Sequence, residues 1–75
     1  IRPDEAAAFL ADPMNLCVLA WDRDEAVGMV TGTVLRHPDK APSLFVNELG
    51  TREGWMRQGI ATALMTRIRA EARAR

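Results

Sequence analysis

The chain has 75 residues and a mass of 8.3 kDa, with ten basic side chains balanced by ten acidic ones and a single cysteine. We expect one domain over residues 1–75, because a chain this short buries only about 60% of the surface that it exposes when unfolded. The balanced charge and the 48% hydrophobic content argue against disorder as the overall state. One cysteine excludes an intramolecular disulfide and a cysteine-rich zinc site, so something else must complete the core.

The opening segment, residues 2–13, predicts a short helix. Pro3 suits the first helical position, the two acidic residues that follow it favour the positive helix start, and Pro13 prevents continuation. The apolar face of this helix is small and centres on Phe9 and Leu10. We therefore expect the helix to contribute little to the core.

Three β-strands are predicted after this helix. The first is the apolar run Leu16–Trp21, and a turn-rich segment separates it from the second, Ala26–Leu35. A loop with two prolines, residues 37–43, precedes the third strand, Leu44–Thr51. The short connections imply an antiparallel meander, and two glycines inside the second strand suggest a bulge or a close backbone neighbour.

The hydrophobic pattern changes to a helical period from Arg57 onward. The apolar positions at this spacing are Ile60, Ala61, Leu64, Met65, Ile68 and Ala72. They predict an amphipathic helix of about four turns. Its arginines alternate with Ala and Glu, which favours a solvated face over a nucleic-acid interface. The order of helix, three strands and helix gives an α/β class with a mixed α+β sheet.

The informative segment is the strand, loop and helix over residues 44–65. We expect Gly59 in the first turn of the helix, where unpaired backbone N–H groups and the helix dipole favour an anion. Arg57 and Gln58 add hydrogen-bond donors at the rim of this position. Gly59 and the small Ala61 let a ligand approach the backbone closely. This junction is therefore the candidate binding site.

The spacing of the glycines excludes two common phosphate-binding motifs. Gly54 and Gly59 satisfy the first part of the Walker pattern, but Ile60 and Ala61 stand where that pattern requires Lys and Ser or Thr. The dinucleotide fingerprint fails as well, because its three glycines are more closely spaced than the glycines at 50, 54 and 59. Nucleotide hydrolysis and dinucleotide binding are not supported.

The same segment resembles the acetyl-CoA motif of the GNAT superfamily of N-acetyltransferases, which is Arg/Gln-x-x-Gly-x-Gly/Ala after a strand. Met56–Ala61 matches this pattern at Gly59 and Ala61, with Met56 at the position of the first Arg or Gln. The run Arg57–Leu64 looks especially like the aminoglycoside 3-N-acetyltransferase branch. Because a Met side chain cannot donate to phosphate, we expect Arg57 and the backbone amides to supply the donors.

The resemblance covers nearly the whole chain. The predicted strands match the second to fourth strands of the family, and the final helix matches its third helix. This implies a partial acyl-CoA N-acyltransferase fold without the C-terminal part of the family, which often supplies a Tyr as general acid. The sequence contains no Tyr, and both of its ends look cut. The next strand would pair beside Leu44–Thr51 and cover Ile60, Leu64 and Ile68.

The resemblance also implies an acetyl-CoA-dependent N-acetyltransferase, which transfers the acetyl group directly from the CoA thioester to a primary amine without a metal ion. Main-chain groups of Leu49, Gly50 and Thr51 would hold the pantetheine arm and polarise the thioester carbonyl. The residues that would wrap the pyrophosphate are Arg57, Gln58, Gly59, Ile60, Ala61 and Thr62.

The attacking amine must lose a proton, so a carboxylate is expected near the end of the third strand. Glu48 is the candidate catalytic base, and Asn47 is the alternative. Strand alternation places these two side chains on opposite faces, and a bulge near the strand end would shift either of them toward the substrate. Glu48 ranks first because of its chemistry rather than its geometry.

Other residues favour plain interpretations. Cys17 lies in an apolar strand and is expected to be a buried, inert thiol, and His37 lacks a second metal-ligating partner. The resemblance implies a small-molecule or peptide amine as the acceptor, and nucleic acid and membrane are not expected partners. No apolar run approaches the roughly 20 residues that span a bilayer, and no signal-peptide pattern is present, so a cytoplasmic setting is expected.

An alternative from another class is a non-catalytic fragment of the same fold. Such a fragment would bind CoA or another anion at the helix start and use the open sheet edge for a homodimer or another partner. Turnover of acetyl-CoA separates the two hypotheses, since only the first requires it.

Overall fold

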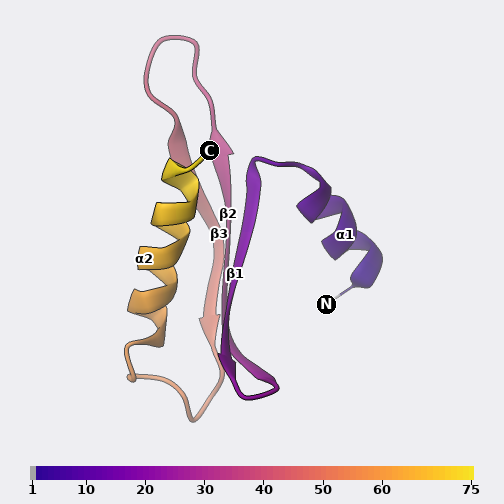
Figure 1. Cartoon of the computed structure of the whole chain (residues 1–75), viewed down its shortest axis with the longest axis vertical. Helices are drawn as coiled ribbons and strands as arrows, with labels where there is room; N and C mark the ends of the chain where they lie inside the picture. Colours follow the sequence, from indigo (N-terminus) through magenta and orange to yellow (C-terminus); the bar gives the residue numbers. More distant parts are fainter. Residues whose placement is uncertain (1) are drawn as a thin grey trace.

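The computed structural model describes residues 2–75, and its element order is the predicted one (Figure 1). The elements are α1 (Pro3–Ala11), β1 (Asn15–Asp22), β2 (Glu25–Leu35), β3 (Ser43–Thr51) and α2 (Ile60–Arg73). The three strands form one antiparallel sheet in the order β1-β2-β3. The two helices lie on opposite sides of this sheet (Figure 1). The meander and the fold class are therefore confirmed.

Helix α1 begins with Pro3 in its first turn and ends two residues before Pro13, as the prolines predict. None of its residues is buried, and the Leu10 side chain is 56% exposed. The Asn15 side-chain amide donates to the Phe9 carbonyl oxygen at 2.9 Å and ties the end of α1 to the start of β1. Helix α1 thus stands beside the sheet without joining the core.

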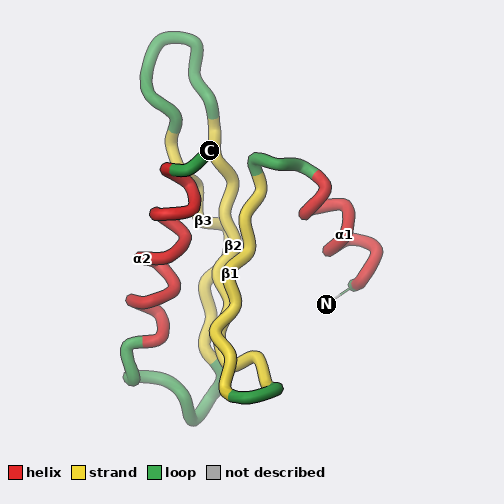
Figure 2. The backbone as a smooth tube through the Cα atoms, in the orientation of Figure 1, coloured by secondary structure: helices red, strands yellow, loops and turns green. Residues whose placement is uncertain are grey.

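Two irregularities shape the sheet, whose path Figure 2 shows. The first lies next to the tight turn between β1 and β2, where the register shifts between Ala20 and Trp21. The second lies in β3. Thr31 pairs with Glu48 and Gly32 pairs with Val46, so Asn47 is an extra residue in its strand. This bulge reverses the alternation of β3 from that point onward.

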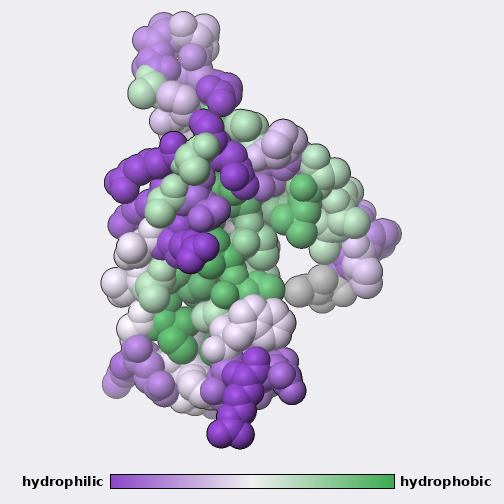
Figure 3. Space-filling model, in the orientation of Figure 1, coloured by the Kyte–Doolittle hydropathy of each residue, from purple (hydrophilic) through white to green (hydrophobic). Residues whose placement is uncertain are grey.

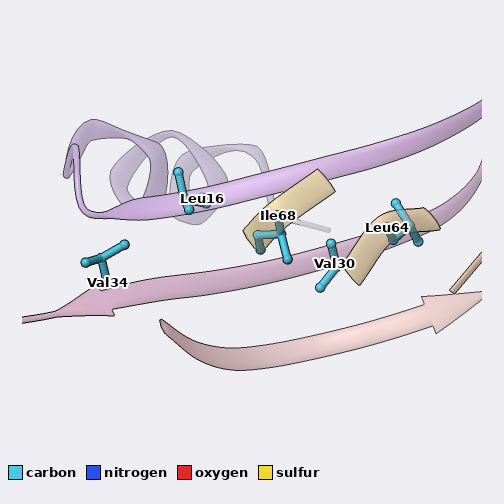
Figure 4. Packing of buried hydrophobic residues seen from close by; sticks show 5 residues of the cluster. All are labelled: Leu16, Val30, Val34, Leu64 and Ile68. Carbon is cyan, nitrogen blue, oxygen red and sulfur yellow. The ribbon is translucent and has the colours of Figure 1, made fainter. Parts of the chain in front are cut away.

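The core lies between the sheet and α2 (Figure 4). Its buried members are Leu16, Val30, Val34, Leu64 and Ile68, of which Val30 and Ile68 are fully buried. The glycines of β2 allow this packing, because a Cβ at Gly28 would lie 2.9 Å from the Ile60 side chain and one at Gly32 would lie 3.1 Å from that of Ile68. The predicted close neighbour of these glycines is therefore helix α2.

The expectation that Leu64 and Ile68 need a further strand to cover them is wrong. Leu64 is 3% exposed and Ile68 is fully buried, because α2 folds back onto the sheet of the same chain. Ile60 is half-buried and packs at the margin of the same core. The helix periodicity identified the apolar face correctly, and the partner of this face is the sheet of the same chain, to which all three strands contribute.

The start of α2 also differs from the prediction. The helix begins at Ile60, so Arg57 and Gln58 belong to the preceding loop, and Gly59 is the N-cap residue rather than part of the first turn. Gly59 adopts a left-handed conformation with φ of 79°, which interrupts the helical path before Ile60. The 14 residues of α2 still give the expected length of about four turns.

Candidate functional site

The end of β3, the following loop and the first turn of α2 enclose a groove of about 500 Å³. Every cofactor-binding residue predicted from the sequence lines this groove except Gln58. These residues are Leu49, Gly50, Thr51, Arg57, Gly59, Ile60, Ala61 and Thr62. The structure therefore brings the predicted set together from two elements and the loop between them.

The loop reaches this shape through three left-handed residues. Their φ angles are 92° at Gly54, 65° at Arg57 and 79° at Gly59. The Gln58 side-chain amide donates to the Gly54 carbonyl oxygen at 3.2 Å, which closes the loop on itself. Gln58 consequently supports the loop from outside the groove instead of lining it. A positive φ at Arg57 is uncommon for a residue with a side chain.

The first turn of α2 presents backbone N–H groups to the groove. The first intrahelical bond runs from the Ala63 amide to the Gly59 carbonyl oxygen at 3.0 Å, so the amides of the three preceding residues have no partner within the helix. No acidic residue lies in this turn, and the positive end of the helix dipole is therefore uncompensated there. Exposed Arg57 adds a full positive charge at the same rim.

The bulge in β3 decides where Glu48 and Asn47 lie. Glu48 is in register with Thr31, which is in register with Cys17, so the three residues form a row across the sheet face opposite α2. Asn47 lines the same side, because it is the extra residue of the bulge. Simple alternation, which predicted opposite faces for Asn47 and Glu48, is wrong here, and the anticipated bulge is the reason.

Both residues line a second groove, of about 450 Å³, between α1 and the sheet. Thr31 forms part of its lining and is only 8% exposed. The Thr31 hydroxyl oxygen is buried without a hydrogen-bond partner among residues 2–75. An unsatisfied buried hydroxyl costs about 1–3 kcal/mol, so Thr31 lowers the stability of the fold.

A chain of hydrogen bonds connects the bulge to α1 across all three strands. The Asn47 amide donates to the Thr33 hydroxyl at 3.2 Å, and that hydroxyl donates to the Asn15 side-chain oxygen at 2.8 Å. The Asn15 amide then donates to the Phe9 carbonyl oxygen at the end of α1. This polar link holds α1 and the bulged segment of β3 in a fixed relation on the same face of the sheet.

Sequence reasoning missed part of the lining. Trp55 and Met56 line the groove at the α2 start, although neither was assigned a binding role. Their position in the loop between two predicted binding segments was the available signal.

An ion pair between Arg52 and Glu25 joins the end of β3 to the start of β2, and no local sequence pattern indicated this ion pair.

The environment of Cys17 gives a testable consequence of the row across the sheet. The expectation that Cys17 is buried is wrong, because this residue is exposed. Partial burial of its thiol, and secondly the negative charge of Glu48, raise the pKa of Cys17 above its ordinary value. At pH 8 we expect iodoacetamide to alkylate Cys17 more slowly than it alkylates the thiol of glutathione, because less of Cys17 is present as thiolate. Glu48→Gln removes the charge and should accelerate alkylation roughly two- to fivefold. An unchanged rate in this variant would contradict the placement of Glu48 near Cys17.

The strand, loop and helix that form the first groove are an arrangement found in acetyltransferases. The chain belongs to the Acetyltransferase (GNAT) family, whose sequence profile matches residues 2–75. A search of curated proteins finds no significant match. No helix within residues 2–75 has the length and apolar character needed to cross a membrane.

Two solved structures share the fold. An acetyltransferase from Vibrio fischeri superposes with a TM-score of 0.74 at 28% identity, over 91% of this chain and 59% of that one. An aminoglycoside 6′-N-acetyltransferase from Acinetobacter haemolyticus, in its apo form, gives a TM-score of 0.83 at 21% identity, over 95% of this chain and 52% of that one. The chain thus spans somewhat more than half the length of either structure. The family is confirmed, and at this identity the second match bears on the fold alone.

Proposed function

We propose that this protein is an acetyl-CoA-dependent N-acetyltransferase that transfers the acetyl group directly from the thioester to a primary amine. The observation that carries the proposal is the groove at the β3–α2 junction, which gathers nearly all of the predicted CoA-binding residues. Membership of an acetyltransferase family supports acetyl transfer in general. The amine as acceptor and the activity of this chain belong to the proposal.

The groove suits the two parts of the acetyl donor differently. The pyrophosphate would meet the free amides of the first α2 turn, Arg57 and the backbone of Gly59, where a side chain is absent. The pantetheine arm would lie along the main chain of Leu49–Thr51. Gly50 suits this close approach, since nothing lies within 4 Å of the position that a Cβ would take there.

The attacking amine must lose a proton, so acyl transfer also needs a base on the side of the thioester from which the amine approaches. Glu48 precedes Leu49 directly and faces the groove beneath α1, so the base and the donor site would be neighbours along β3. The amine nitrogen attacks the thioester carbonyl carbon, the new N–C bond forms, the C–S bond breaks, and CoA leaves as its thiolate. Glu48 accepts the proton lost by the amine, and backbone N–H groups stabilise the charge that develops on the carbonyl oxygen.

Isothermal titration with CoA and a thiol-release assay with acetyl-CoA and an amine panel test the proposal. Glu48→Gln should lower kcat about 100-fold, because the amide cannot accept the proton, and should leave CoA affinity unchanged. Glu53→Gln in the exposed loop is the matched control and should keep full activity. Undiminished kcat in the Glu48 variant would exclude this residue as the base, and absence of CoA binding would overturn the proposal itself.

The non-catalytic alternative is separated by the same two measurements. A fragment that binds CoA or another anion without acetyl transfer would give heat in the titration and no thiol release with any amine. Within residues 2–75 both β1 and β3 are edge strands, and exposed Phe45 and Leu49 lie on β3. A partner that pairs with either edge would then be the functional target of the fold.

A further inference from the structure

The loop between β3 and α2, residues 52–59, contains no buried residue. Trp55 is partly buried, and the rest of the loop is exposed. The loop lies at the end of the molecule where β3 ends and α2 begins (Figure 1), and hydrophilic residues gather at the surface of this end (Figure 3). Packing against the core therefore does not fix the shape of the loop, and local hydrogen bonds must do so.

Within the described residues 2–75, two hydrogen bonds restrain the segment 53–58. The Trp55 amide donates to the Arg52 carbonyl oxygen at 3.0 Å, which forms a turn directly after β3. The Gln58 side-chain amide donates to the Gly54 carbonyl oxygen at 3.2 Å. The second bond closes the remaining half of the loop into a ring.

Arg57 lies inside this ring and has an unfavourable backbone conformation. Its φ of 65° is disfavoured by the Cβ of an L-residue, so Arg57 would turn to negative φ if nothing restrained it. Gly54 and Gly59 also have positive φ, but they carry no Cβ and adopt these angles without this penalty. A turn at Arg57 would redirect the backbone that follows it, including Gly59 and the free amides of the first α2 turn.

We propose that Gln58 is a positioning residue of the donor site, which holds Arg57 in its left-handed conformation and does not itself contact the donor. The proposal rests on the acetyltransferase function argued above. Arg57 and Gly59 line the groove, whereas Gln58 and Gly54 do not, so the hydrogen bond acts from outside the binding surface. Without this bond, the guanidinium of Arg57 and the helix amides lose their common orientation toward the groove.

A double-mutant cycle, measured by isothermal titration with CoA, separates positioning from direct contact. Gln58→Ala should raise the Kd of CoA about five- to tenfold, because Arg57 then spends most of its time at negative φ. In the Arg57→Gly background, where positive φ carries no penalty, the same substitution should raise the Kd less than about twofold. Equal losses in the two backgrounds would mean that Gln58 contacts the donor directly, and an unchanged Kd for Gln58→Ala alone would mean that it has no part in the site. Either result overturns the inference.

Trp55 allows the shape of the loop to be followed without a ligand. The chain has two tryptophans, so Trp21→Phe leaves Trp55, which lies inside the ring, as the only one. Trp21 is 60% exposed, and its replacement should leave the fold intact. In this background Gln58→Ala should raise the acrylamide quenching constant of Trp55 about twofold, because the loop opens more often. Glu53→Gln, an exposed change in the same loop that keeps the hydrogen bond, is the matched control and should not raise it.

The two measurements distinguish this inference from the proposed function. An unchanged quenching constant in Gln58→Ala would overturn the inference, whatever the affinity for CoA. Absence of CoA binding by the unsubstituted protein, with the rise in Trp55 quenching retained, would count against the acetyltransferase function and not against closure of the loop by Gln58.

Discussion

Gly59→Glu is expected to lower the affinity for CoA roughly 1,000-fold or more, which corresponds to about 4 kcal/mol. Gly59 lies at the start of α2 and lines the groove, and the space around its Cα is open, so a longer side chain would project without a steric clash. The new carboxylate would compete for the free amides of the helix and repel the pyrophosphate. Isothermal titration with CoA measures the loss directly.

Gly54→Glu is the matched control for this change. Gly54 also has a left-handed backbone, with φ of 92°, and open space around its Cα, but it does not line the groove. Both variants therefore introduce the same charge and a similar backbone strain, of about 1–2 kcal/mol. Equal loss of CoA affinity in the two variants would show that strain in the loop, rather than access to the helix amides, determines binding.

Ile68→Ala is expected to lower the free energy of unfolding by about 2–5 kcal/mol. Ile68 is fully buried between α2 and the sheet, and its truncation leaves a cavity beneath Gly32 that the backbone cannot close. Small domains have only about 5–15 kcal/mol of stability in total, so a large part of the protein should unfold at moderate urea concentrations. Urea titration followed by circular dichroism gives the midpoint.

Leu10→Ala provides the comparison for this substitution. It removes a side chain of equal size from α1 that is 56% exposed, so the expected change is within about 0.5 kcal/mol. A similar shift of the urea midpoint in both variants would mean that α1 shares the core with α2. That result would contradict the assignment of the core to one face of the sheet.

The elements with strong local signals could be predicted from the sequence. Pro3 and Pro13 delimit α1 because they fix the backbone at the ends of a helix, and the apolar runs give the three strands and their order. The start of α2 could not be predicted in the same way. The left-handed conformation of Arg57 follows from the path of the loop between β3 and α2, and a non-glycine residue gives no local sign of it.

The two grooves also differ in how far their residues could be predicted from the sequence. The residues of the groove at the β3–α2 junction are close together along the chain, and a single motif therefore predicted almost all of them. The groove beneath α1 combines residues from α1 and all three strands, which only the tertiary arrangement brings together. The position of Glu48 depended on one extra residue in β3, and the sequence indicated that a bulge was possible there but not which residue it would involve.

Because the two helices are buried to different extents, the two sides of the sheet differ in local stability. Helix α2 cannot leave the sheet without exposing Leu64 and Ile68, whereas α1 has no buried residue and is held mainly by the polar link from Phe9 to Asn47. Local opening of α1 therefore costs far less than global unfolding, and its amides should exchange with solvent much faster than those of α2. The side of the sheet that carries α2 and the groove at its start should therefore stay formed while α1 opens.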